Sequence, residues 1–125
     1  MNFQDLLDKA ERAAESAKIL LKAGDVDGAC NRAYYAMFDA ARAALLLKNP
    51  SVPLETIKTH GGLITSFSMH LVKTKIVTVE LGKTLNKAED LRLIADYKGD
   101  SIEVEQAEWV VKQAAIFINA MKDLA

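Results

Sequence analysis

The scarcity of helix-breaking residues is the feature that most constrains how this chain can fold. Its 125 residues include only two prolines, Pro50 and Pro53, and six glycines, and these residues fall in a few clusters. Long uninterrupted segments are therefore expected between the clusters. A chain of this length forms one domain and removes roughly two thirds of its unfolded surface from water. The sequence predicts a single domain over residues 1–125.

Apolar residues recur at helical spacing in five segments, which predicts a five-helix, all-α bundle. The expected helices run from about Asn2 to Lys22, from Asp25 or Asp27 to Lys48, from between Leu54 and His60 to near Lys73, from Thr78 to Tyr97, and from Ser101 to the C-terminus. The N-caps of the first, fourth and fifth helices are expected at Asn2, Thr78 and Ser101. Gly24 and Gly99 are the expected stops of the first and fourth helices.

Two features of the helices predict how they pack. Small residues form a stripe along one face of the second helix, at Ala29, Ala33, Ala36, Ala40, Ala43 and Leu47. Small side chains let a neighbour approach closely, so we expect the first two helices to form an antiparallel hairpin. The segment Ala114–Ile118 is apolar all round, which predicts either a central place in the bundle or half of a subunit interface.

Composition excludes several classes of function. The 16 Lys and Arg residues against 17 Asp and Glu residues give a net charge of −1, without the basic excess typical of nucleic-acid binding beyond a small local patch. The single cysteine, Cys30, excludes a disulfide framework and a cysteine-based zinc site, and buried filler is its expected role. The longest hydrophobic run is six residues, and the N-terminus is polar. We therefore expect no membrane helix and no signal peptide, with the cytoplasm as the default location.

The two histidines give little support to a metal site. His60 shares a helical face with Ile64 and Phe67, which favours a core or helix-start role over a catalytic one. No His-x-x-x-His or Glu-x-x-His pairing exists, so neither a metal nor a cofactor is expected. The glycine pair Gly61–Gly62 is compatible with a phosphate-contacting helix start, although close packing explains it better.

The segment from Glu89 to Tyr97 is the densest in polar groups. Glu89, Arg92 and Asp96 stand at positions i, i+3 and i+7, on one helical face. Taken alone, this pattern favours a solvated ladder of ion pairs worth at most about 1 kcal/mol.

Three blocks of sequence favour a functional role for this segment over a purely structural one. Residues 31–38 read NRAYYAMF and are followed by Ala40–Ala43. They resemble the second-helix signature of the HEPN (higher eukaryotes and prokaryotes nucleotide-binding) domain proteins. Residues 58–64 and 92–97 resemble two further blocks of a small stand-alone branch of that family, in the same order. The resemblance covers essentially the whole chain.

The resemblance implies an up-and-down bundle of four or five helices that is usually a homodimer. Many such proteins are metal-independent ribonucleases and act as toxins, often encoded beside a minimal nucleotidyltransferase that serves as antitoxin. Their active site is an arginine followed after four to six residues by a histidine, with the two copies meeting across the dimer cleft. In related toxins a tyrosine close to this motif is adenylylated by the partner.

This chain departs from the motif, because Arg92 is followed by Asp96 and Tyr97 and not by a histidine. Generating a tyrosinate at pH 7 costs about 4 kcal/mol, so Tyr97 is a poor base. We therefore expect weak or absent ribonuclease activity, with Arg92, Asp96 and Tyr97 as candidate catalytic residues and Arg92 and His60 as nucleotide contacts. Tyr97 is also the candidate adenylylation point, although it lies about 140° from Arg92 around an ideal helix.

The function predicted on this basis is the toxin-side component of a pair with a minimal nucleotidyltransferase. Its expected partners are a second copy of the chain, that nucleotidyltransferase, and RNA or a nucleotide. Three alternatives stay open. The protein is an active metal-independent ribonuclease that uses His60 as the base, or a nucleotide-binding adaptor that cleaves nothing. In the third alternative, the polar block around Arg92 has only a structural role and joins helices through ion pairs and hydrogen bonds.

Overall fold

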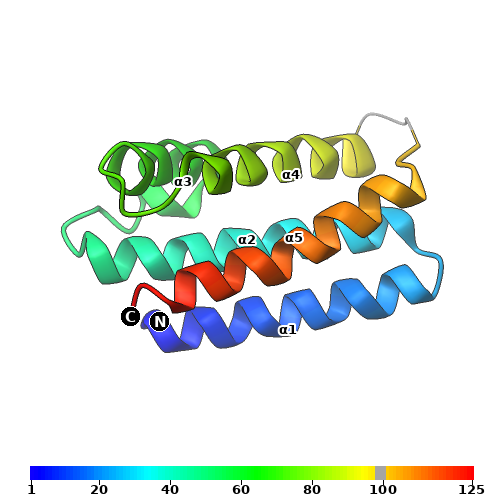
Figure 1. Cartoon of the computed structure of the whole chain (residues 1–125), viewed down its shortest axis with the longest axis horizontal. Helices are drawn as coiled ribbons and strands as arrows, with labels where there is room; N and C mark the ends of the chain where they lie inside the picture. Colours follow the sequence, from blue (N-terminus) through cyan, green and yellow to red (C-terminus); the bar gives the residue numbers. More distant parts are fainter. Residues whose placement is uncertain (98–100) are drawn as a thin grey trace.

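The computed structural model describes residues 1–97 and 101–125, and the regular secondary structure of this part is entirely helical, without a strand. The helices are α1 (Phe3–Lys22), α2 (Val26–Lys48), α3 (His60–Phe67), α4 (Val79–Tyr97) and α5 (Val104–Lys122). A short 3₁₀ turn, η1 (Thr56–Lys58), precedes α3, and a π-helical turn, η2 (Ser68–Val72), continues it. The prediction of an all-α bundle is confirmed (Figure 1).

Local capping fixes the starts of three helices where the sequence predicts them. The side chain of Asn2 accepts a hydrogen bond from the Asp5 N–H at 2.8 Å, and Asp25 caps α2 in the same way. Thr78 accepts from the Leu81 N–H at 3.4 Å at the start of α4. Gly24 ends α1 in the left-handed region, with φ at +86°.

The predicted N-cap of the last helix is wrong by two residues. Glu103, and not Ser101, occupies the N-cap of α5, and the Gln106 side chain accepts a hydrogen bond from the Glu103 N–H at 3.0 Å. Ile102 is buried at 7% exposure, so packing holds the chain extended past the serine. The predicted stop at Gly99 lies outside the described residues.

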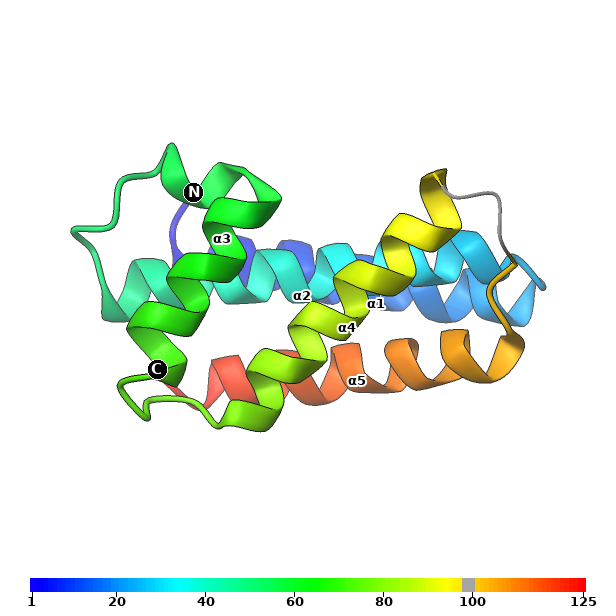
Figure 2. The same ribbon diagram turned by 90° about the horizontal axis from the view of Figure 1, so that it is seen from above.

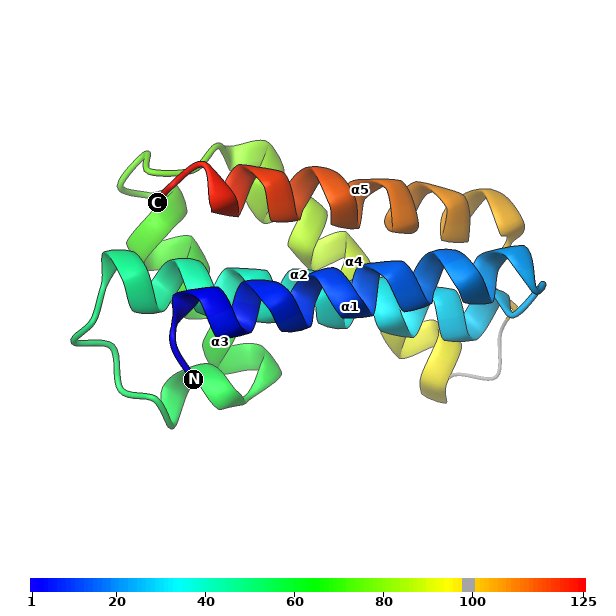
Figure 3. The same cartoon turned by 90° about the horizontal axis from the view of Figure 1, so that it is seen from below.

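The helices are arranged in three layers (Figure 1). α1 lies across the underside of α2 and α5 (Figure 3), and α3 and α4 cover their upper side. Seen from above, α4 runs diagonally from over α5 to over α2, while α3 crosses the other half of α2 (Figure 2). α2 therefore touches every other helix and forms the floor beneath α3 and α4.

The core follows the small-residue stripe of α2. The five alanines of the stripe are fully buried, and only Leu47 at its end is exposed. The predicted α1–α2 hairpin is confirmed. Ala114, Phe117 and Ile118 are buried and Ile116 is 45% exposed, so the apolar segment of α5 turns one side to the centre of the bundle and keeps Ile116 at the surface. Among the described helices, none is long and apolar enough to cross a membrane.

Candidate functional site

Five side chains from three helices meet above α2, and we call them the tyrosine–arginine cluster. They are Tyr34, Tyr35, His60, Glu89 and Arg92. The two tyrosines lie on α2, His60 begins α3, and the remaining two residues lie one turn apart on α4. They meet because α3 and α4 both cross over α2 (Figure 2).

Tyr34 connects His60 to Glu89. Its side chain is fully buried, and its hydroxyl oxygen lies 2.8 Å from Nδ1 of His60 and 3.3 Å from Oε2 of Glu89. The hydroxyl of Tyr35 lies 3.4 Å from Nε2 of the same imidazole. Each ring nitrogen of His60 therefore faces one tyrosine hydroxyl.

The start of α3 explains how His60 reaches this position. Thr59 is the N-cap, and its hydroxyl accepts a hydrogen bond from the Gly62 N–H at 3.1 Å. A Cβ on Gly62 would overlap the carbonyl oxygen of Thr56, so only glycine lets η1 press against the first turn. Close packing therefore explains Gly62 but not Gly61, which has open space around it. Because Thr59 does the capping, the imidazole is left for other contacts.

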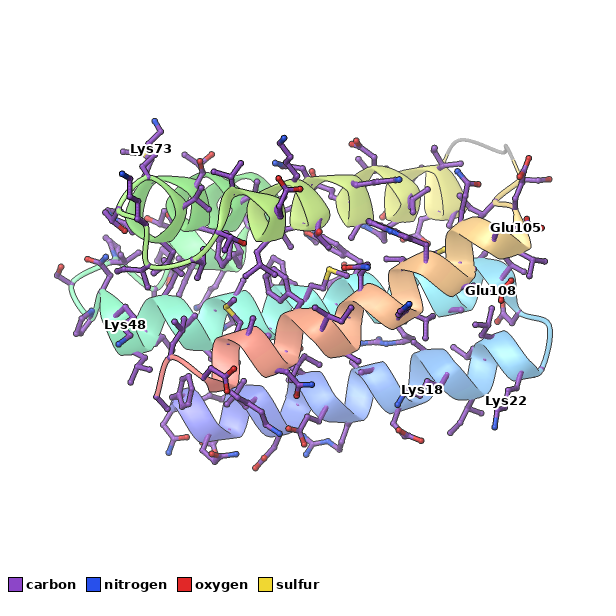
Figure 4. All side chains as sticks on the ribbon, in the orientation of Figure 1. Lys18, Lys22, Lys48, Lys73, Glu105 and Glu108 are labelled. Carbon is purple, nitrogen blue, oxygen red and sulfur yellow. The ribbon has the colours of Figure 1, made fainter. Side chains whose placement is uncertain are left out.

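Arg92 is a buried cation, with 4% of its surface exposed. Its Cζ lies 5.1 Å from the ring centroid of Tyr34 and 5.9 Å from that of Tyr35, and Nη1 lies 3.7 Å from Oδ2 of Asp96. The Nε atom is buried without a hydrogen-bond partner among the described residues. The interpretation of this face as a solvated ion-pair ladder is therefore wrong for Arg92. The buried Arg92 side chain contrasts with lysines such as Lys18 and Lys22, which point outward from α1 (Figure 4).

Asp96 fastens the end of α4 to α2. Nδ2 of Asn31 donates a hydrogen bond to Oδ2 of Asp96 at 3.0 Å, and the same oxygen is the one nearest to Arg92. The carboxylate thus has a neutral donor on one side and a cation on the other. This arrangement suits a residue that positions Arg92.

Tyr97 lies at the rim of the cluster. It is 74% exposed, and its ring centroid lies 5.8 Å from Cζ of Arg92. The two Cα positions are far apart around α4, as the sequence predicts, but the long arginine side chain spans that angle. The two side chains therefore approach each other within one helix, despite the angle of about 140° between their positions.

Burial and neighbouring charges keep the side chains of His60 and Tyr34 neutral at pH 7. Burial, with the nearby Arg92 charge, lowers the pKa of His60, while Glu89 acts in the opposite direction. Burial, followed by the Glu89 charge, raises the pKa of Tyr34 above its ordinary value. A neutral imidazole beside a permanent cation can accept a proton while the cation stabilises negative charge on phosphorus. Within residues 1–97 and 101–125, no three His, Cys, Asp or Glu side chains gather so as to hold a metal ion.

Further cations lie beside the cluster on the α1 side. Cζ of Arg32 lies 5.4 Å from the ring centroid of Tyr35. Arg32 also lines a surface depression of about 480 Å³ together with Lys9 and Arg12 of α1. These side chains form a local basic patch on a chain whose net charge is −1.

The structure places the four predicted site residues near one another. Arg92 and His60 are in the cluster, with Asp96 and Tyr97 next to it. Sequence reasoning missed the roles of Tyr34, Tyr35 and Glu89, because aromatic residues in a bundle helix are usually core. The signal was present, since both tyrosines lie in the NRAYYAMF block and Glu89 stands one turn before Arg92.

The HEPN domain profile matches residues 3–124, which is almost the full chain. This chain belongs to the HEPN family. One relative is a UPF0332 protein of Gloeobacter violaceus, which is 38% identical over 98% of this chain and 95% of its own length. Two proteins of Methanocaldococcus jannaschii are each 34% identical over 96% of this chain, and over 79% and 86% of their own lengths. Both carry the name "Putative toxin".

Membership in the HEPN family confirms the resemblance drawn from the three sequence blocks. In this HEPN protein each block supplies part of one location. The first supplies both tyrosines and Asn31, the second supplies the Thr59 cap and His60, and the third supplies Arg92, Asp96 and Tyr97.

Proposed function

We propose that this HEPN protein is the toxin-side component of a pair whose other member is a minimal nucleotidyltransferase. The observation that carries the proposal is the exposed Tyr97 side chain, whose ring centroid lies 5.8 Å from Cζ of Arg92. A nucleotidyltransferase needs an accessible acceptor hydroxyl, and a cation close to it favours the phosphate that is added. The relatives named as toxins support the toxin side of the pair.

The proposed modification transfers an adenylyl group from ATP to Tyr97. The phenolic oxygen bonds to the α-phosphorus, pyrophosphate leaves, and the phenolic proton passes to solvent. The new phosphodiester carries one negative charge at the rim of the cluster, where Cζ of Arg92 lies 5.8 Å from the Tyr97 ring centroid. Pairing of this phosphate with Arg92 would occupy the cation and so silence the toxin.

Co-expression with a minimal nucleotidyltransferase encoded next to this gene, followed by intact mass and peptide mapping, tests the proposal. We expect one adenylyl adduct, which disappears in Tyr97→Phe and persists in Tyr35→Phe. Tyr34 is fully buried and is not expected to react. No adduct from a partner shown to be active, or an adduct mapped to Tyr35, contradicts the proposal.

A second candidate function is metal-independent cleavage of RNA by the same cluster. The observation that favours it is the His60 imidazole, which shares both tyrosines with Arg92. This contact between separate helices supplies a proton acceptor that the sequence after Arg92 lacks. If cleavage occurs, it should persist in EDTA and fall about 10² to 10³-fold in Arg92→Ala. Cleavage that survives Arg92→Ala would place the site elsewhere.

A further inference from the structure

We infer that His60 is the general base for RNA cleavage, and that Tyr34 and Glu89 are positioning residues that keep its proton on Nδ1 and its lone pair on Nε2. The inference rests on the second candidate function, cleavage of RNA. The inference goes beyond that function in naming the nitrogen of His60 that takes the proton and the residues that fix its tautomer. Its starting point is the hydrogen-bonded chain that runs from Glu89 through Tyr34 to His60.

The direction of that chain follows from the number of protons available. An ionised Glu89 can only accept, so the single hydroxyl proton of Tyr34 points to Oε2, 3.3 Å away. The oxygen of Tyr34 is then left as an acceptor at 2.8 Å from Nδ1 of His60. An acceptor at this distance requires a proton on Nδ1, and a neutral imidazole then carries its lone pair on Nε2.

The surroundings of Nε2 leave room for a substrate hydroxyl. The only described hydrogen-bonding contact of Nε2 is the Tyr35 hydroxyl at 3.4 Å, which is long for a hydrogen bond. Tyr35 and His60 are both partly exposed, whereas Tyr34 behind them is fully buried. A ribose 2′-hydroxyl can therefore replace the Tyr35 contact from the solvent side without disturbing the bond to Nδ1.

The charges around His60 keep it in the basic form. From α4, Glu89 and Arg92 face it, and from α2 the hydroxyls of Tyr34 and Tyr35. Burial and Arg92 lower the pKa of His60 against the opposing effect of Glu89. The imidazole is therefore neutral at pH 7. Arg92, which packs against the same two tyrosine rings, is the cation assigned to the phosphate in this step.

The step can be written with its atoms balanced. Nε2 of His60 takes the proton of the 2′-hydroxyl, and the 2′-oxygen bonds to the adjacent phosphorus. The bond from phosphorus to the 5′-oxygen of the next nucleotide breaks, and that oxygen takes a proton from water. His60 later returns its proton to solvent, where it neutralises the hydroxide. The products are a 2′,3′-cyclic phosphate and a 5′-hydroxyl.

The test begins with the tautomer, because it does not depend on activity. The chain has two histidines, so the ¹⁵N imidazole spectrum contains one signal set from His60 and one from His70 as internal reference. We expect the Nδ1–H form for His60 in the wild type. Tyr34→Phe keeps the ring and removes the hydroxyl, so it should shift His60 toward the Nε2–H form. A wild-type His60 in the Nε2–H form overturns the inference.

Cleavage of a short single-stranded RNA in EDTA supplies the second readout. We expect His60→Gln to lower the rate about 10² to 10⁴-fold, as loss of a general base does, and His70→Gln to leave it unchanged. Tyr34→Phe and Glu89→Gln should lower it less and move the acidic limb of the pH–rate profile. Added imidazole should partly restore His60→Ala, and a 2′-deoxy nucleotide at the cleaved position should block the reaction.

The possible outcomes distinguish the role of His60 from the ribonuclease function and from the adenylylation of Tyr97. Cleavage that needs Arg92 but not His60 leaves the ribonuclease function standing and overturns the role of His60. A wild-type protein that does not cleave RNA under these conditions overturns both the ribonuclease candidate and the inference. Neither result bears on adenylylation of Tyr97, which the mass measurement tests separately.

Discussion

Arg92 shows how one residue can be both costly to the fold and suited to a ligand. Taking a guanidinium out of water costs several kcal/mol, and the single contact to Asp96 at 3.7 Å is too long to offset all of it. Tyrosine faces within 6 Å contribute about 0.5–2 kcal/mol each. Its Nε is buried and has no hydrogen-bond partner among the described residues, which leaves a polar group unsatisfied. A phosphate that reached it would supply an acceptor oxygen and a compensating charge.

His60 gives a prediction about acid stability. Its pKa is lowered in the folded chain, whereas the unfolded imidazole titrates near ~6.5. Between those two values the unfolded state binds more protons. The contribution of neutral His60 to the free energy of unfolding is therefore fully present above about 6.5 and is lost as pH falls through the folded pKa.

Urea unfolding at several pH values in this range measures the effect. The wild type should lose more stability on acidification than His60→Gln, and His70→Gln should behave like the wild type. Equal pH dependence in the wild type and His60→Gln would show that the imidazole does not prefer its neutral form in the fold.

The adjacent glycines at the start of α3 give a prediction at the scale of an element. Gly62→Ala forces a methyl group into the carbonyl of Thr56 and should lower the free energy of unfolding by about 1–3 kcal/mol. Gly61→Ala meets no atom within 4 Å and should raise it by about 0.5–1 kcal/mol, because alanine is the better helix former. Chemical denaturation of the two variants gives both values, and a matching sign would contradict the packing assigned to Gly62.

Helices in this chain could be predicted from sequence because their determinants are local. Asn2 and Asp25 each cap a helix by accepting from a backbone N–H three residues ahead, and the alanine stripe of α2 repeats every three or four residues. The error at Ser101 arose where a longer-range effect, the burial of Ile102, overrode a local preference.

The cluster could be predicted only in part because its contacts are not local. Tyr34 is 26 residues from His60 and 55 from Glu89, and Asn31 is 65 from Asp96. Their meeting depends on the diagonal path of α4 over α2 (Figure 2), which no spacing within one helix reveals. The sequence block predicts Arg92 as a site residue. Its burial, which contradicts the interpretation as an exposed ion-pair ladder, depends on tertiary packing.

At the scale of the whole molecule, the core buries most of the apolar segment of α5, whereas the rim of the tyrosine–arginine cluster is exposed to solvent. Ala114, Phe117 and Ile118 are buried within one chain, so they no longer argue for a second subunit. Tyr97, by contrast, is 74% exposed beside Arg92. The HEPN resemblance puts the subunit contact at the cleft that holds the arginine. The expected homodimer should therefore form across this rim.

Sedimentation at micromolar concentration tests the homodimer and its location together. We expect a mass of about twice 13.7 kDa for the wild type. Tyr97→Asp adds a charge next to Asp96 at the rim, where it would be desolvated on association, so it should shift the protein toward monomer. Ile116→Asp is the matched control, since Ile116 is also an exposed apolar residue but lies on α5, and it should leave the dimer intact. A monomeric wild type would contradict the dimer, and dissociation by Ile116→Asp alone would move the interface to α5.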